Sequence, residues 1–133
     1  MLYSLANLHR RQGGFEKALY YAKRLTVAKP RWAKAHDAVG AILLAIGDLV
    51  GAGHALNYAV QLDHTLATAH GNLGMLKAER REWTEALEHL EAALSLAPNM
   101  AEAHNNRGNV LISLDRLPEA EAAFLRALEL APE

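Results

Sequence analysis

A spacing of 34 residues runs through the whole chain and constrains its fold more than any other feature. Histidine, glycine, alanine and leucine recur at this interval, and so does proline, except that His64 occupies one of its positions. The positions are His36, His70 and His104; Gly40, Gly74 and Gly108; Ala18, Ala52, Ala86 and Ala120; Ala59, Ala93 and Ala127; Leu62, Leu96 and Leu130; and Pro30, Pro98 and Pro132. Such a period indicates a stack of equal units, each burying its apolar face against its neighbours. We divide the chain into four units, at about 1–32, 33–66, 67–100 and 101–133.

Each unit predicts two helices joined by a short polar break. In residues 67–100, apolar and small side chains recur at helical spacing on both sides of Arg81 and Glu82. Pro98 then ends the second helix, because proline lacks an amide hydrogen and clashes with the preceding turn. Small residues at positions 74, 86 and 93 would let the two helices approach closely. Alanine and leucine are abundant and β-branched residues are few, so we predict an all-α fold.

Composition and charge narrow the classes of protein. The 133 residues are 51% hydrophobic and 22% charged, which is typical of a globular chain. Residues 1–34 hold eight Lys or Arg against one Glu, 35–66 hold three Asp and no base, and 67–133 hold six bases against eleven acids. The basic end could attract an acidic partner, or it could be a solvated surface. The absence of cysteine excludes disulfides and fits a reducing compartment such as the cytoplasm, and no stretch predicts a membrane helix.

The repeated positions resemble the tetratricopeptide repeat (TPR) family, whose pattern runs from an aromatic residue through Leu-Gly, Tyr, Ala and Phe to Pro. The third unit matches it at His70, Leu73, Gly74, Lys77, Ala86, Leu90 and Pro98, and the fourth at His104, Arg107, Gly108, Leu111, Ala120, Phe124 and Pro132. Histidine replaces the usual aromatic residue in three units, and Arg107 replaces a leucine. The resemblance implies a right-handed superhelical α-solenoid of about four helix-turn-helix units, with the first helix of each unit lining a concave face.

That concave face is where members of the family usually bind peptides or helices, so the resemblance implies a binding groove. We expect the groove to be basic at its start, apolar in the second unit and rich in asparagine at its end. Its candidate binding residues are Asn7, Arg10, Arg11, Lys34, Asp37, Ala41, Leu44, Asn72, Met75, Glu79, Asn105, Asn106 and Asn109. An asparagine amide both donates and accepts, so Asn72, Asn106 and Asn109 could hold a peptide backbone, or they could be solvated or bonded locally. A clamp for chaperone tails is not expected, because the chain has Asp37, Ala41 and Glu102 where such a clamp needs Lys, Asn and Lys.

Catalysis, metal binding and nucleic-acid binding find little support. His36, His70 and His104 lie on helices at least about 8–10 Å apart, whereas a zinc–nitrogen bond is about 2 Å, so we expect packing residues and no metal. Glu85 and His89 at i, i+4 indicate a surface contact within one helix rather than a ligand pair. No serine lies in a nucleophile motif and no phosphate-binding loop occurs, so we expect no enzyme and no cofactor. The basic residues near Trp32 spread around a helix, so we expect no nucleic acid.

These observations predict a protein-interaction scaffold that binds a protein or peptide in its groove. An alternative is a substrate-selecting segment of a larger enzyme such as a glycosyltransferase, because the Asn-rich first helices resemble the TPRs of O-linked N-acetylglucosamine transferases. The chain lacks polar capping units, so we expect a piece of a longer array. Its last helix, at about 118–130, would then expose Leu117, Phe124 or Leu128 and allow self-association. Gly51 and Gly53 inside a predicted helix mark the weakest unit.

Overall fold

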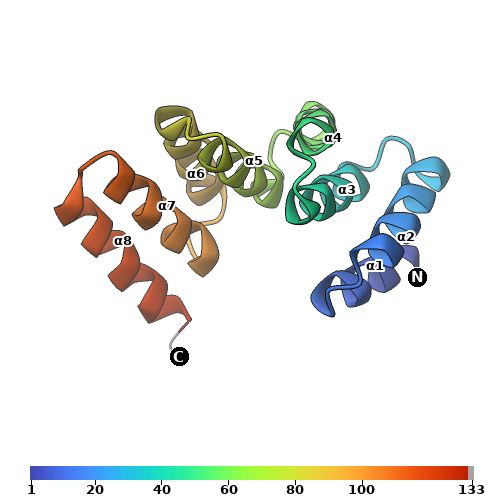
Figure 1. The fold of residues 1–133 in the computed structure, drawn as a ribbon, viewed down its shortest axis with the longest axis horizontal. Coiled ribbons are helices and arrows are strands. Elements are labelled where there is room, and N and C mark those ends of the chain that lie inside the picture. Colours follow the sequence, from blue (N-terminus) through green and yellow to red (C-terminus); the bar gives the residue numbers. More distant parts are fainter. Residues whose placement is uncertain (132–133) are drawn as a thin grey trace.

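The computed structural model describes residues 1–131, and within that range the chain forms eight α-helices and no strand (Figure 1). The helices are α1 Leu2–Arg11, α2 Phe15–Ala28, α3 Ala33–Ile46, α4 Leu49–Leu62, α5 Ala67–Glu79, α6 Trp83–Leu96, α7 Ala101–Ser113 and α8 Leu117–Leu130. Successive helices pair as hairpins, and Figure 1 shows the four hairpins following one another along an arch. The prediction of an all-α solenoid is confirmed.

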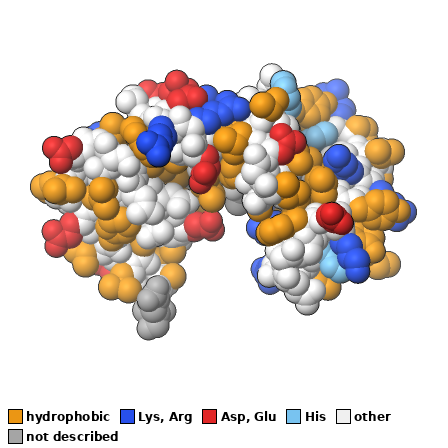
Figure 2. Space-filling model, viewed as in Figure 1, with side chains coloured by type: hydrophobic (Ala, Val, Ile, Leu, Met, Phe, Trp, Pro, Cys, Tyr) orange, Lys and Arg blue, Asp and Glu red, His pale blue; other side chains and the backbone are white. Residues whose placement is uncertain are grey.

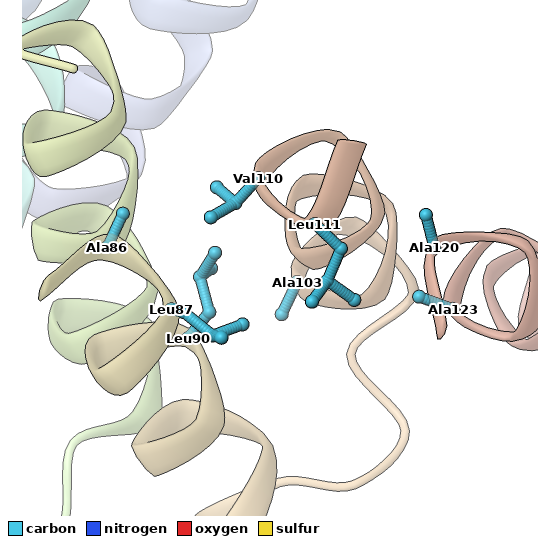
Figure 3. Close-up of a cluster of buried hydrophobic side chains, with 8 residues drawn as sticks. All are labelled: Ala86, Leu87, Leu90, Ala103, Val110, Leu111, Ala120 and Ala123. Atoms are coloured by element: carbon cyan, nitrogen blue, oxygen red, sulfur yellow. The ribbon is translucent and has the colours of Figure 1, made fainter. Parts of the chain in front are cut away.

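The 34-residue ladders mark the contacts inside and between hairpins. Ala18, Ala52 and Ala86 are 0% exposed, so these side chains are the places where the paired helices touch. Gly40, Gly74 and Gly108 face the second helix of their own hairpin: a Cβ atom added there would lie 2.5–2.7 Å from Leu56, Leu90 and Phe124 respectively. Figure 3 shows one core cluster, in which side chains of α6 meet those of α7 and α8. The expected close approach at Gly74 is therefore confirmed.

Each hairpin turns through one residue in the left-handed region, and these residues form a further 34-residue ladder. They are Gly13, Gly47, Arg81 and Asp115, with φ of 77°, 99°, 60° and 58°. In every case the next residue donates its amide to the carbonyl five positions earlier, at 2.8–2.9 Å, which is the bond of a Schellman helix end. Glycine adopts this conformation without strain, so Gly13 and Gly47 suit their turns better than Arg81 and Asp115 suit theirs.

The histidine ladder has a structural role. His36, His70 and His104 are half-buried, as predicted. In each, ring Nε2 lies 2.8–2.9 Å from the backbone carbonyl six residues earlier, on Pro30, His64 and Pro98. A carbonyl oxygen only accepts, so Nε2 must donate. Each histidine thus ties the start of a first helix to the turn that leads into it. Pro132, the last of the proline ladder, lies outside the described residues.

Of the two glycines in α4, Gly51 has a structural role and Gly53 has none that the contacts show. The carboxylate of Asp48 caps α4 by accepting the amide of Gly51 at 3.0 Å, and a Cβ atom on Gly51 would lie 2.5 Å from that carboxylate. Gly51 therefore makes room for the cap, the one side-chain cap among the described helix starts. Gly53 has no such contact, because its nearest neighbour would be Leu76 at 3.4 Å.

The last hairpin exposes apolar side chains on α8. Leu117, Leu125 and Leu128 are each more than half exposed. Phe124, also expected to be exposed, instead lies over Gly108 and is half-buried. No helix within residues 1–131 has both the length and the apolar character needed to cross a bilayer.

Candidate peptide-binding groove

The first helices of the four hairpins line a shared pocket of about 200 Å³. Its residues come from α1, α3, α5 and α7, together with Met100 just before α7. They are Tyr3, Asn7, Arg10, Asp37, Ala38, Ala41, Thr68, Gly71, Asn72, Met75, Met100, Glu102, Ala103 and Asn106. We call this the central pocket. A second hollow adjoins it and shares Met75 and Asn106 with it. In Figure 2 the molecule is hollowed between its two halves, with Lys and Arg gathered mostly on the α1–α3 side.

Nine of the thirteen candidate residues lie in these two hollows. Asn7, Arg10, Asp37, Ala41, Asn72, Met75 and Asn106 line the central pocket, and Glu79 and Asn109 line the second hollow. Arg11, Lys34 and Asn105 are exposed but line neither. Leu44 packs against the core that contains Leu56, Leu73 and Leu76, so it does not line either hollow.

Met100 and Ala103 belong to the central pocket but were not among the candidates. Met100 precedes the first residue of α7, at a position that the repeat assigns to Trp32 and Leu66 in the earlier units. Both of those residues also directly precede a first helix. An apolar residue directly before each of the last three first helices, at Trp32, Leu66 and Met100, was the signal that could have found Met100.

Asp37 is the one buried charged residue within the described part of the chain, with 9% of its surface exposed. The Thr68 hydroxyl donates to its Oδ2 at 2.7 Å, and the Asn72 amide nitrogen donates to its Oδ1 at 2.8 Å. Both donors lie on α5, so this network connects α3 to α5 across the concave side. We call it the Asp37 network. The second unit was expected to give the groove an apolar middle. The Asp37 network makes the base of the groove polar there instead.

The electrostatics of Asp37 reflect its burial. Loss of solvent raises the pKa of the Asp37 carboxyl above its ordinary value, and the bonds from Thr68 and Asn72 and the charge of Arg10 offset only part of that rise. Arg10 lies beyond ion-pair distance, since no salt bridge joins it to Asp37. A carboxylate in this setting costs folding free energy unless a cation approaches it.

The Asp37 network changes the interpretation of the groove asparagines. Asn72 donates one of its two amide hydrogens to Asp37, which is the local bonding that stood as the alternative to peptide binding. The side chains of Asn106 and Asn109 make no hydrogen bond to any other residue within 1–131. The groove asparagines with unbonded side chains are therefore Asn106 and Asn109 on α7 and Asn7 on α1, rather than Asn72 on α5.

Charged pairs outside the groove hold hairpins together. Lys77 lies 3.0 Å from Glu85 and 3.2 Å from Glu82, and these two acids raise the pKa of the lysine. The expected contact of Glu85 with His89 along one helix is not made. Glu85 instead pairs with Lys77 of the other helix of its hairpin. No group of three or more His, Asp or Glu side chains within residues 1–131 is placed to hold a metal ion.

Comparison with known proteins identifies the repeat. Residues 72–133 match the family model of the tetratricopeptide repeat. Residues 72–133, which make up most of the third unit and all of the fourth, are therefore similar to tetratricopeptide repeats. Among solved TPR structures, TTC0263 of Thermus thermophilus is 27% identical, with a TM-score of 0.88 over 99% of this chain and 73% of that one. YrrB, described as a TPR protein with an unusual peptide-binding site, is 20% identical with a TM-score of 0.76 over 99% of this chain and 68% of that one, and it shares the fold.

A curated relative of the TPR segment is the protein O-mannosyl-transferase Tmtc2 of Drosophila melanogaster. It is 44% identical over 62 residues, which are 46% of this chain but only 7% of Tmtc2. The match therefore lies within a small part of a much longer protein. It bears on the repeat and not on the rest of Tmtc2.

Proposed function

We propose that the chain is a protein-interaction scaffold that binds an extended peptide or a helix along its concave groove. The observation that carries this proposal is the central pocket, because side chains from all four first helices converge on it. A pocket built by four repeats fits a ligand that runs along the superhelix. Asn106 and Asn109 supply unbonded amides that can pair with a peptide backbone, and Met75 and Met100 supply apolar contact.

The comparisons support this proposal at the level of the fold. YrrB has the same fold and is described as having a peptide-binding site. No chemical step by the groove residues is part of the proposal, so the protein acts by binding. The partner is a protein or a peptide.

The test is a comparison of two asparagine variants in a pull-down followed by mass spectrometry. Asn106→Ala with Asn109→Ala removes the two unbonded groove amides of α7, and Asn57→Ala removes an exposed side-chain amide of α4 that makes no hydrogen bond. We expect the groove variant to lose partners that the wild type and Asn57→Ala both retain. Equal recovery of every partner by all three proteins would refute binding through the α7 amides.

A second candidate function follows from the match to Tmtc2. The segment would belong to a larger glycosyltransferase, where the same groove selects the protein to be modified. The identity of 44% over 62 residues favours this candidate over other enzymes. The sequence resemblance to N-acetylglucosamine transferase repeats supports the same class of role. Sequencing the complete gene and assaying its product for sugar transfer to proteins, with and without the repeats, separates this candidate from a free-standing scaffold.

We also infer that α8 can join two copies of the chain. Leu117, Leu125 and Leu128 are more than half exposed and lie around a shallow apolar surface with Phe124. Contiguous apolar surface of this kind often marks an interface. Sedimentation velocity at rising concentration tests this: wild type should show dimers or larger species, and Leu125→Glu with Leu128→Glu should not. A wild type that sediments only as a monomer refutes the inference.

A further inference from the structure

The central pocket is open above α5 because one side chain of the repeat is missing there. The 34-residue period relates Tyr3, Asp37, Gly71 and Asn105, so α5 alone has glycine at this position. Gly71 is buried, and a Cβ atom added to it would meet only the tip of Met100, at 3.7 Å. The space over Gly71 is thus free for a guest side chain. Met75, Met100 and Ala103 line the same pocket and give that space apolar sides.

The charges around this space favour a cation. The charged residues that line the pocket are Asp37 from α3, Glu102 from α7 and Arg10 from α1, two acids against one base. Glu102 forms no ion pair with another residue within 1–131, and neither does Arg10. Arg10 and Glu102 are both exposed, so water and salt screen their charges more than they screen that of the buried Asp37. The least screened charge that lines the pocket is therefore the negative one of Asp37, and the lining residues carry one net negative charge.

Asp37 can still accept hydrogen bonds after its network has formed. Thr68 and Asn72 each occupy one site on one carboxylate oxygen, and an ionised carboxylate offers about four such sites. Both donors are neutral, so they orient the carboxylate without cancelling its charge. The network holds a buried anion in a fixed position facing the groove, without an ion pair.

We propose that the central pocket binds a Lys or Arg side chain of a peptide partner. The aliphatic stem of that side chain lies over Gly71 between Met75 and Met100, and its cationic head lies between Asp37 and Glu102. Long basic side chains bury an apolar stem while keeping a charged head in polar surroundings, which matches this division of the pocket. An acidic side chain would meet two carboxylates, and an aliphatic one would remove more water from Asp37 without pairing it. This inference rests on the proposed groove function and names the residue that the groove selects.

The experiment is a selection from a random dodecapeptide library displayed on phage, using immobilised wild-type protein, and sequencing of the retained peptides. We expect Lys or Arg to be enriched at one position of the retained peptides. In a synthetic peptide taken from the selection, replacing that residue by norleucine should weaken binding about tenfold, the effect of one charged hydrogen bond. The same peptide with glutamate there should bind more weakly still.

Three variants locate the site. Asp37→Asn with Glu102→Gln keeps the shape but removes both charges, so it should still retain peptides but lose the basic preference. Gly71→Leu fills the space and should reduce retention, and Gly71→Ala, which adds a methyl group in ordinary contact, should reduce it less. Circular dichroism and melting temperature confirm the fold of each variant before the selection is interpreted.

The outcomes separate the two levels of the proposal. The pocket assignment would be overturned if wild type retained peptides without enrichment of Lys or Arg, or if Asp37→Asn with Glu102→Gln enriched them equally. Either result would leave groove binding itself supported. Unchanged retention by a folded Gly71→Leu would place the side chain elsewhere and also overturn it. No retention above a protein-free surface would overturn groove binding itself.

Discussion

Two chemically identical substitutions, Gly74→Ala and Gly53→Ala, should have opposite effects on stability. Both glycines lie within helices, where replacing glycine by alanine gains about 1 kcal/mol of helix propensity. They differ in what a new methyl group would meet. At Gly74 it would lie 2.7 Å from Leu90 Cγ and 3.3 Å from the Ala86 carbonyl, whereas at Gly53 its nearest neighbour would be Leu76 Cδ2 at 3.4 Å.

The contact at Gly74 cannot be relieved cheaply. Leu90 is fully buried, and the clashing atom is its branch point rather than the end of a flexible chain. Overpacking of this kind costs about 2–3 kcal/mol, which exceeds the gain in propensity and leaves a net loss of about 1–2 kcal/mol. Gly53→Ala keeps the gain of about 1 kcal/mol. The two variants should therefore differ by about 2–3 kcal/mol in free energy of unfolding.

Urea unfolding followed by circular dichroism measures this difference through the transition midpoint. With a slope of about 1–3 kcal/mol per molar urea, the two midpoints should lie about 0.7–3 M apart. A double-mutant cycle of Gly74→Ala with Leu90→Ala tests the cause. Removing the leucine branch should make the two changes less than additive by at least about 0.5 kcal/mol. Additive effects, or a Gly74→Ala protein as stable as wild type, would refute the argument from the hairpin contact.

Three further predictions concern single residues. Burial raises the pKa of Asp37 in the folded protein, so the stability that this carboxyl contributes is complete below its unfolded pKa and is lost as pH rises through its folded pKa. Asp37→Asn should therefore become more stable relative to wild type as pH is raised from about 4 to 7. Urea unfolding at each pH measures this, and a difference that stays constant with pH would contradict it. His104→Leu removes the bond to the Pro98 carbonyl and should lose about 0.5–1.5 kcal/mol by thermal unfolding, whereas His54→Leu, at an exposed residue without a hydrogen bond, should lose little. Arg81→Gly relieves a positive φ and should gain about 0.5–1 kcal/mol, so an unchanged melting temperature would show that this turn holds no strain.

The sequence allowed the helices to be placed because the repeated residues are the buried ones. Ala52, Ala86 and Gly74 recur at the interval of the unit since each must fit against a neighbouring helix. Surface positions have no such constraint, so a periodic pattern fixes the hairpin contacts and leaves the groove less determined. The left-handed turns show the limit: Gly13 and Gly47 indicate a positive φ by residue type, whereas at Arg81 and Asp115 only the 34-residue spacing indicates it.

The Asp37 network was missed because the groove residues were assigned one helix at a time. Thr68 and Asn72 lie 31 and 35 residues after Asp37. The repeat places Gly71 of α5 at the position that Asp37 has in α3. Thr68 comes three residues before Gly71 and Asn72 one residue after it, so both lie beside that position on α5. Pairing polar residues at those two separations would have found the network. Leu44 packs against the core whereas Arg10 and Ala78, at the same position of the repeat, line the hollows, so the repeat position alone does not decide which side chain faces the groove.

The Asp37 network also makes the solenoid mechanically uneven. It ties α3 to α5 by two short bonds, and the same positions in the next unit, Gly71, Glu102 and Asn106, form no such tie. Among neighbouring first helices of the described chain, α5 and α7 are the least closely packed pair. The joint between the second and third hairpins should therefore resist bending more than the joint between the third and fourth. The central pocket spans that joint, so whatever fills it would fix the curvature of the whole array.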